Sequence, residues 1–223
     1  MKKLNWGVLG TAKIAAEWLC PALSAAPRGR FAAIASRSRA SAEAFAAPYD
    51  NVKAYGEYES LLADPDIDAI YIPLPNTDHI SWTLKCLAAG KHVLCEKPIA
   101  MQASEIDQLI IARDQTGLLA AEAFMVTHHP QWHRVRDWIA AGKIGKLKHV
   151  QGAFSYFNDE PGNIRNQAAF GGGALPDIGV YPSITTRFVT GEEPLSARST
   201  IEWQNGVDTT ARVQADFPGF SAD

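Results

Sequence analysis

Cysteine is scarce in this sequence, and long apolar runs do not occur. The 223 residues include three cysteines, Cys20, Cys86 and Cys95, an odd number without the spacing of a metal site. We expect them to be reduced thiols, as is usual in the cytoplasm. No apolar run is long enough to span a bilayer, and the amino terminus lacks the features of a secretory signal. The sequence therefore predicts a cytoplasmic protein that is not embedded in a membrane.

An excess of positive charge is also missing. The chain has 21 Lys and Arg against 24 Asp and Glu, which gives a formal net charge of −3. Because a nucleic-acid-binding surface needs a basic field, nothing in this balance favours a nucleic-acid partner. Hydrophobic residues make up 47% of the chain, which is typical of a globular protein with a full core. The length suggests one large domain or two small ones.

The first half of the chain alternates predicted strands with predicted helices. Such alternation argues for a doubly wound parallel sheet, and we place this domain at residues 1–122. The predicted strands cover residues 4–10, 30–36, 68–72, 92–95 and 118–124, with a short extended piece at 52–55. The main predicted helices cover 11–25, 41–47, 78–89 and 103–115, and a small helix contains Leu61 and Leu62.

A small-residue turn follows the first predicted strand. Gly10-x-Ala12-x-x-Ala15 has the spacing of a dinucleotide fingerprint, with alanine at the second and third glycine positions. Gly10 allows a tight turn, and the helix amino end offers N–H groups to a pyrophosphate. The alternative is an ordinary strand-to-helix turn without a ligand.

The second strand ends in Ser36-Arg37, and no acidic residue occurs between Arg30 and Ala42. Arginine and serine can bind a 2′-phosphate, so the pattern favours NADP over NAD, the alternative being a solvated basic loop.

The second half, residues 123–223, reads differently. Helices are predicted at 128–141 and from about Gly179 to Val189, and strands at 147–157, 195–203 and 207–217. Gln204-Asn205-Gly206 is typical of a hairpin turn between the last two strands. This half is therefore predicted to be an α+β domain with a mostly antiparallel sheet and helices on one face.

Two clusters carry candidate chemistry. Glu96-Lys97-Pro98 follows the strand at 92–95, at the sheet edge where open parallel sheets bind ligands. Pro98 would fix the turn that aims Lys97, a cis bond being one way to do so. Asp177 and Tyr181 are spaced to share a helix face, and a tyrosine beside an ammonium group can exchange a proton with a substrate hydroxyl. The alternatives are a strand exit with solvated Glu96 and Lys97, and a core aromatic for Tyr181.

Three histidines invite a metal interpretation. His129 and His133 are four residues apart, and His128 adjoins them, but no glutamate lies between them as in zinc proteases. We therefore predict no metal site. A role in lining the substrate site is the better hypothesis for His128 or His129, because they begin a helix just after a strand of the sheet.

Three motifs in this order resemble the glucose–fructose oxidoreductase, inositol dehydrogenase and MocA family. They are Val8 to Ala15, Cys95-Glu96-Lys97-Pro98, and Gly171 to Tyr181. The tyrosine version, followed by Gly191-Glu192-Glu193-Pro194, is most similar to the branch with D-xylose dehydrogenase and dimeric dihydrodiol dehydrogenase.

The resemblance implies an α/β protein, with a Rossmann-type domain followed by an α+β domain whose open sheet often mediates dimerisation. It implies an NADP-dependent oxidoreductase acting on a sugar, polyol or cyclic diol, with Lys97 and Tyr181 catalytic and Asp177 ordering the site. The candidate cofactor contacts are Gly10, Thr11, Ala12, Lys13, Ile14, Ser36, Arg37, Pro73, Asn76, His79, Glu96 and Lys97. The candidate substrate contacts are His128, Phe154 and Asp177.

One departure from the family concerns length. Family members usually run past 300 residues, whereas this chain stops at Asp223. The expectation is either a fragment or a shortened protein whose exposed sheet edge needs a partner, with a homo-oligomer formed through the second sheet. The alternative function is a non-catalytic NADP-binding paralogue that serves as a sensor or assembly partner.

Overall fold

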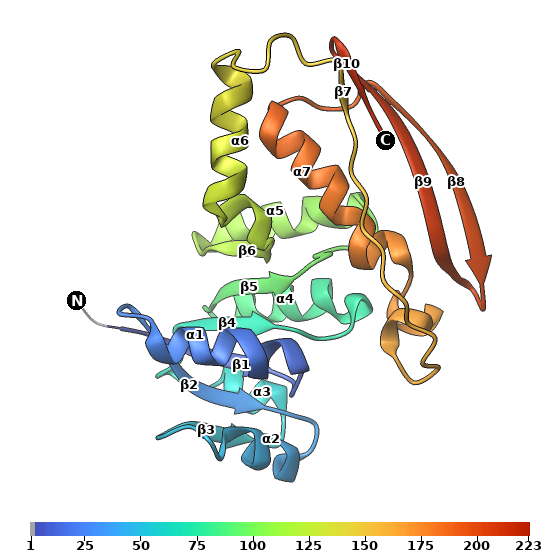
Figure 1. Ribbon diagram of the computed structural model, residues 1–223. Helices are drawn as coiled ribbons and strands as arrows, with labels where there is room; N and C mark the ends of the chain where they lie inside the picture. The colour runs from blue at the N-terminus through green and yellow to red at the C-terminus, as the bar shows by residue number, and fades with distance from the viewer. Residues whose placement is uncertain (1–2) are drawn as a thin grey trace. The chain divides into compact units, whose positions relative to one another are not determined.

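The computed structural model describes residues 3–223, which form two compact units divided between Ala123 and Phe124. Each unit has its own sheet, and the two are described separately below (Figure 1).

The first unit contains a six-stranded sheet in which every neighbouring pair is parallel. Its strand order is β3-β2-β1-β4-β5-β6. Strands β2 and β3 are added on one side of β1, and β4, β5 and β6 on the other side, so the predicted doubly wound sheet is confirmed. The strands are β1 Leu4–Leu9, β2 Gly29–Ala35, β3 Lys53–Tyr55, β4 Ala69–Ile72, β5 His92–Glu96 and β6 Ala120–Ala123.

Helices cover both faces of this sheet. Successive residues of a strand point to opposite faces, and the buried residues accordingly fall into two core clusters. Val8, Ile34 and Tyr71 pack with η1 Ala15–Leu19, α1 Cys20–Ala25 and α2 Arg39–Ala46. On the other face, Leu9, Ala35, Ile70 and Ile72 pack with α3 Tyr58–Leu62, α4 His79–Ala88 and α5 Ser104–Thr116. The three free cysteines are buried in these clusters, and burial raises the pKa of the Cys20 and Cys86 thiols to about 12.

The second unit holds a four-stranded mixed sheet in the order β7-β10-β9-β8. Its strands are β7 His149–Val150, β8 Ser196–Gln204, β9 Val207–Phe217 and β10 Phe220–Ala222. Two of the three pairings are antiparallel, as predicted. Asn205 and Gly206 both have positive φ, 52° and 82°, which is the conformation of a type I′ hairpin turn. The predicted hairpin between the last two long strands is therefore confirmed.

The strand predicted at 147–157 is wrong over most of its length. Only His149 and Val150 are in a strand, paired with β10, and 151–157 have no ladder. Alternation of apolar and polar side chains indicates which residues would share a face of a strand. A strand also needs a partner of similar length, and β10 has only three residues. β10 itself was not predicted.

The helix that carries Tyr181 begins earlier than predicted. α7 Val180–Thr190 is preceded directly by a π-helical turn, η6 Leu175–Gly179, which contains Asp177. A second π-helical turn, η1, follows the small-residue turn of the first unit. Such turns are rare in proteins, and those that occur are often found at functional sites. α6 Pro130–Ala140 packs beside α7, and its start lies near the predicted one.

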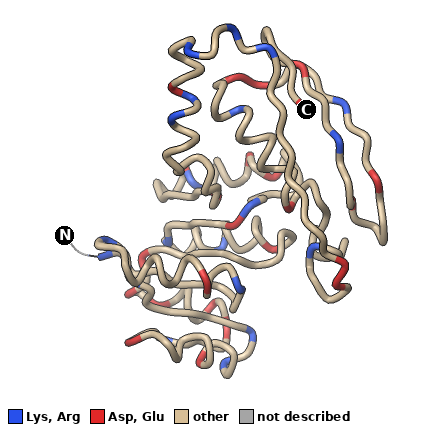
Figure 2. The backbone as a smooth tube through the Cα atoms, viewed as in Figure 1, with Lys and Arg blue, Asp and Glu red and all other residues tan. Residues whose placement is uncertain are grey.

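Charged residues of both signs are interspersed along the backbone (Figure 2). Within residues 3–223, no helix combines the length and the apolar character that a membrane crossing needs.

Candidate active site

The turn after β1 has the geometry of a dinucleotide cradle. Gly10 has φ +86°, and its N–H donates to the Ala35 carbonyl at 2.7 Å. A Cβ at this position would lie 3.0 Å from Leu74 Cδ2, so both the conformation and the space favour glycine. Ala15 is fully buried under the turn, while Thr11, Lys13 and Ile14 are exposed and Ala12 is half-buried. The turn thus leaves backbone and small side chains at the carboxyl edge of the sheet.

The end of β2 carries the predicted phosphate-binding residues. Ser36 is buried and its Oγ accepts from the Ser38 N–H at 3.3 Å, whereas Arg37 is exposed. Burial raises the pKa of Tyr58, and the nearby Arg37 cation lowers it in part. The Tyr58 hydroxyl lies 3.7 Å from the place a Gly10 Cβ would take. Tyr58 therefore lies near both the Gly10 turn and Arg37 at the end of β2. The sequence did not reveal this position, because α3 has only five residues.

Glu96 is held from inside the sheet. The phenol of Tyr71 on β4, 2% exposed, donates to Glu96 Oε1 at 2.5 Å. Burial raises the pKa of Tyr71, and the charge of Glu96 raises it further, so the phenol stays protonated as the donor. Glu96 is the last residue of β5 and Lys97, which is half-buried, follows it directly.

The segment after Lys97 is fixed on both sides of one peptide group. The Lys97–Pro98 bond is cis. The carbonyl oxygen of Pro98 lies 2.7 Å from Nδ1 of His79, and the Ile99 N–H donates to Glu122 Oε1 at 2.8 Å. His79 is fully buried, and its Nε2 lies 2.8 Å from the carbonyl oxygen of Leu74. Of the other predicted contacts on the β4 side, Pro73 is buried and Asn76 begins the η2 turn Asn76–Asp78.

In the second unit, two aromatic rings flank Tyr181. Its ring centroid lies 5.2 Å from that of Phe124 and 5.4 Å from that of Phe154. Phe154, a predicted substrate contact, is 51% exposed. The tyrosine therefore stands among apolar rings at the second residue of α7, and one of these rings remains accessible to a ligand.

Asp177 is the centre of a polar network. Its Oδ2 accepts from the Tyr156 phenol at 2.6 Å, and its Oδ1 lies 3.0 Å from Arg165 Nε. Burial alone would lower the pKa of Arg165, but Asp177 and the phenols of Tyr156 and Tyr181 raise it above its ordinary value. Burial also raises the pKa of Tyr156, and Asp177 adds to that rise. Tyr156 lies in the segment predicted to be a strand at 147–157, and Arg165 lies between the predicted elements, so the sequence pattern indicates a site role for neither residue.

Asp208 on β9 caps the helix that carries Asp177 and Tyr181. It is 6% exposed, and its Oδ2 accepts from the Leu175 N–H at 2.6 Å. Gly173 has φ +131°, and a Cβ there would lie 2.0 Å from Asp208 Oδ1. The glycine run before the helix therefore makes room for a carboxylate from a distant strand, a contact without a local sequence signal.

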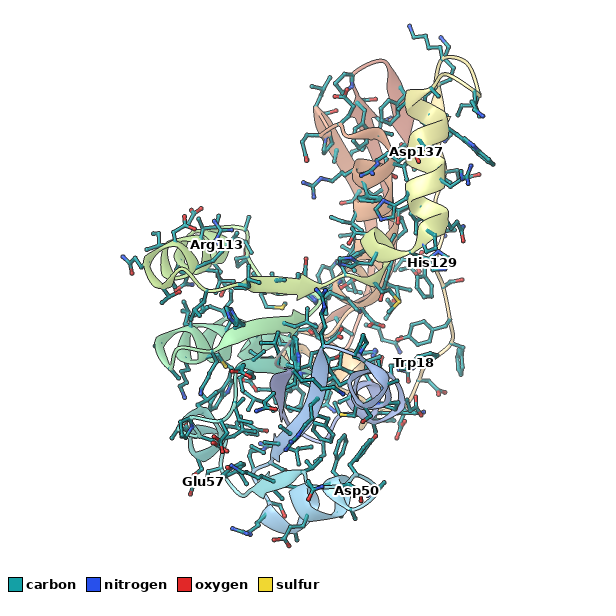
Figure 3. The ribbon with its side chains drawn as sticks, turned by 90° about the vertical axis from the view of Figure 1, so that its left-hand side faces the viewer. Trp18, Asp50, Glu57, Arg113, His129 and Asp137 are labelled. Carbon is teal, nitrogen blue, oxygen red and sulfur yellow. The ribbon has the colours of Figure 1, made fainter. Side chains whose placement is uncertain are left out.

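The histidines take separate roles. His128 is exposed at the end of η3 Met125–His128. His129 caps α6 (Figure 3), its Nδ1 accepting from the Gln131 N–H at 3.1 Å. His133 packs edge-on against Phe188, with ring centroids 5.3 Å apart. Among residues 3–223, no three His, Cys, Asp or Glu side chains gather as metal ligands.

Comparison with models of protein families shows which family the chain belongs to. Residues 4–124 match the family described as "Oxidoreductase family, NAD-binding Rossmann fold", and residues 132–223 match the GFO/IDH/MocA C-terminal domain. The chain belongs to the GFO/IDH/MocA family. The resemblance inferred from the three motifs is thereby confirmed.

Known relatives of this GFO/IDH/MocA protein cover nearly all of it. An uncharacterized oxidoreductase of Rhizobium meliloti is 42% identical over 98% of the chain and 66% of its own length. A dTDP-3,4-didehydro-2,6-dideoxy-alpha-D-glucose 3-reductase of Streptomyces violaceoruber is 37% identical over 98% of the chain and 64% of its own length. The NADP(+) D-xylose 1-dehydrogenase 2 of Haloferax volcanii is 36% identical over 96% of the chain and 70% of its own length. The chain thus spans about two thirds of these proteins.

A solved structure has the same fold. The 3-ketoreductase KijD10 from Actinomadura kijaniata, in complex with NADP and TDP-benzene, matches with a TM-score of 0.90 and 36% identity. The match covers 99% of this chain and 69% of the reductase.

Proposed function

We propose that this protein is an oxidoreductase that transfers a hydride between NADP and a hydroxyl or carbonyl group of a sugar, polyol or cyclic diol. The observation that carries the proposal is the position of Lys97. It follows β5 at the carboxyl edge of the sheet, next to a fixed carboxylate, and the Gly10 turn lies at the same edge because β1, β4 and β5 are parallel neighbours. This is the edge where open α/β sheets bind ligands.

The cofactor is proposed to be NADP. The cradle fits a dinucleotide, since Gly10 adopts the φ of +86° that the tight turn needs and the small residue Ala12 stands at the position where the backbone approaches a pyrophosphate. Ser36 and Arg37 offer a hydroxyl and a guanidinium to a 2′-phosphate, and no acidic residue occurs between Arg30 and Ala42. The complex of KijD10 with NADP and the cofactor named for the Haloferax dehydrogenase support this choice. NADP, when bound, would supply or accept the hydride.

The protein's own groups would handle the proton. We assign Tyr181 as the acid–base residue that takes the proton of the substrate hydroxyl in oxidation and returns it in reduction. Lys97 would stabilise the tyrosinate and the developing alkoxide by its positive charge. Asp177 would order the second unit's part of the site through Tyr156 and Arg165. His128 and Phe154 remain the proposed substrate contacts.

A structurally similar enzyme, KijD10, supports the assignment of Lys97 and Tyr181. KijD10 has been solved with one tyrosine replaced and, separately, with one lysine replaced. The number of residues between those two positions equals the number between Lys97 and Tyr181. The names of the relatives support the substrate class, since they include a sugar ketoreductase, a sugar dehydrogenase and the trans-1,2-dihydrobenzene-1,2-diol dehydrogenase of Xenopus laevis.

The test is a panel of sugars and diols assayed by nicotinamide absorbance, with Tyr181→Phe and Lys97→Met. Loss of a positioned acid–base group costs about 10²- to 10⁴-fold in rate, so we expect each variant to lose about that much kcat while still binding NADPH. Tyr49→Phe and Lys146→Met serve as matched controls. Wild-type turnover in both site variants would refute the assignment. NADPH binding without turnover on any substrate would favour a non-catalytic sensor or assembly partner.

Assembly and location complete the proposal. We propose a homo-oligomer formed through the sheet of the second unit, because β8 is paired on one side only within that sheet. A cytoplasmic location agrees with three free, buried thiols. Light scattering during gel filtration would test the first point, since a monomer at micromolar concentration would refute it.

A further inference from the structure

We propose that His79 is a positioning residue for Lys97 and that it works as a doubly protonated ring. In this role, it clamps the segment after Lys97 to the loop after β4. The part of the inference that concerns catalysis depends on the proposed function; the part that concerns the ring does not.

Hydrogen-bond donors are the first argument. Both ring nitrogens of His79 meet backbone carbonyl oxygens, Nδ1 at 2.7 Å from Pro98 and Nε2 at 2.8 Å from Leu74. A carbonyl oxygen can only accept, and a neutral imidazole has only one N–H. A neutral ring would therefore set one lone pair against another at hydrogen-bond distance. Two N–H groups satisfy both oxygens.

Charge around the clamp is the second argument. The Pro98 carbonyl and the Ile99 N–H belong to the same peptide group. The carbonyl end faces the His79 ring, and the N–H end donates to the Glu122 carboxylate at 2.8 Å. A cation at the oxygen end and an anion at the hydrogen end both polarise this peptide in the same direction. Glu122 thus supplies the negative charge that a fully buried imidazolium needs, across a single peptide unit.

The clamp acts on the residue before it. Lys97 precedes Pro98, and its other neighbour, Glu96, is fixed by Tyr71. The ionisable groups on the segments that meet at His79 are Asp78, Glu96, Lys97 and Glu122. Because a misplacement of about 1 Å can cost about 10²-fold in rate, a clamp on the next peptide is well placed to set the aim of Lys97. Full burial of the ring makes this role a better fit for His79 than the direct cofactor contact expected from the sequence.

The chain contains its own reference rings. Nδ1 of His92 accepts from the Leu119 N–H at 3.0 Å, and Nδ1 of His129 accepts from the Gln131 N–H at 3.1 Å. An accepting nitrogen carries no proton, so both rings are neutral when these bonds are formed. The same measurement should therefore distinguish His79 from His92 and His129.

The ring state is tested by nitrogen NMR of the histidine-labelled full chain at pH 7.5, without cofactor or substrate. Signals are assigned with His92→Gln, His129→Gln and His79→Gln. We expect two protonated nitrogens in His79, against a bare Nδ1 in His92 and His129. A bare nitrogen in the His79 ring would overturn the proposal, whatever the protein catalyses.

Positioning is tested with His79→Gln and Glu122→Gln, with His92→Gln as the matched control. We expect kcat to fall about 10- to 100-fold in the first two, with NADPH affinity changed less than about threefold, and the control to stay near wild type. Amide resonances of Lys97 and Ile99 should shift in the same two variants. If the wild type is active, an unchanged kcat in His79→Gln and Glu122→Gln would refute the positioning role. If the wild type is inactive, unchanged Lys97 and Ile99 amide shifts in these variants would refute it. An inactive wild type with the expected shifts would count against the proposed function only.

Discussion

The phenol of Tyr71 donates to the Glu96 carboxylate at 2.5 Å, linking β4 to the last residue of β5. The contact comes from within the sheet, because Tyr71 is 2% exposed and belongs to the cluster under α1. Glu96 is therefore not a solvated strand exit, which was the alternative for this motif. Its neighbour Lys97 leaves the sheet from a fixed point.

Tyr71→Phe should destabilise the protein. A hydrogen bond to a charged group contributes about 1.5–3 kcal/mol, and its removal leaves a half-buried carboxylate short of one donor. We expect a loss of about 2 kcal/mol in the free energy of unfolding, measured by urea denaturation at pH 7. Tyr49→Phe is the matched control, since the Tyr49 ring packs edge-on against Phe31. Equal losses in the two variants would contradict the role given to the Tyr71 hydroxyl.

Arg37→Ala should weaken the preference for NADP. The guanidinium is exposed beside Ser36 and near Tyr58, where it can pair with a 2′-phosphate. A charge-assisted hydrogen bond of about 1.5–3 kcal/mol corresponds to an affinity loss of about 10- to 100-fold. We expect that loss for NADPH and little change for NADH, measured by fluorescence titration. Arg113→Ala, on the exposed end of α5 (Figure 3), is the control. Equal losses for both cofactors, or tighter NADH binding in the wild type, would refute the prediction.

Local patterns were enough to predict the sheet of the first unit. Buried parallel strands read as short apolar runs, and the helices between them show helical spacing, so element type and order follow from sequence. The Gly10 turn and the Asn205-Gly206 hairpin were also predictable, because each depends on backbone conformations that few residues adopt.

The contacts that organise the site were not predictable in this way. Tyr71 and Glu96 are 25 residues apart, and Leu175 and Asp208 are 33 apart. Such pairs are set by strand register and by how a helix lies on a sheet, which no local pattern records. The same limit explains why the strand predicted at 147–157 ends at Val150 in the structure, since alternation at 151–157 says nothing about a partner strand.

Asp208→Ala should loosen the helix start that carries Asp177. Removing a capping carboxylate costs about 0.5–2 kcal/mol, and here the cap is buried. We expect a loss near the upper end of that range and a lower kcat, because Tyr181 follows on the same helix. Denaturation and steady-state kinetics measure the two effects. Asp216→Ala, on the same strand, is the control, because the Asp216 carboxylate accepts from the Ser196 hydroxyl on a neighbouring strand.

Gly173→Ala gives an independent check on the same contact. The new Cβ would lie 2.0 Å from Asp208 Oδ1, in a conformation that L side chains rarely adopt. We expect the substitution to cost less in an Asp208→Ala background than in the wild type, since the carboxylate is then gone. A double-mutant cycle of unfolding free energies measures this coupling. Strict additivity would show that the two residues do not meet.

Arg165→Lys should lower activity although the charge is kept. The guanidinium Nε lies 3.0 Å from Asp177 Oδ1, and a lysine amine cannot reproduce that planar geometry. We expect a fall of about tenfold in kcat with little change in NADPH affinity. Arg187→Lys is the matched control, because Arg187 pairs with Glu193 at the far end of α7. A wild-type kcat in Arg165→Lys would show that the network around Asp177 does not order the site.

Asp64 should make the stability of the first unit depend on acid pH. It is 8% exposed, and it accepts from Tyr55 at 2.6 Å, from Lys53 at 2.9 Å and from the Asp66 N–H at 2.9 Å. Burial would raise the pKa of this carboxyl, but these hydrogen bonds outweigh burial and lower the pKa from 3.8 to about 2. The folded state therefore favours the carboxylate. Its contribution is fully present above pH about 4 and is lost as the pH falls towards 2.

The variant Asp64→Asn isolates this contribution. A pKa lowered by nearly two units corresponds to about 2 kcal/mol, so the wild type should be more stable than the variant by about that amount at pH 6. The difference should shrink steadily between pH 4 and pH 2, because protonation of Asp64 in the wild type removes the charge that its donors stabilise. Urea denaturation at a series of pH values measures it. Asp50→Asn, at an exposed position (Figure 3), should give a curve parallel to the wild type. A wild-type minus Asp64→Asn difference that stays constant from pH 6 to pH 2 would mean that the Tyr55 and Lys53 hydrogen bonds do not hold the carboxylate in its charged form.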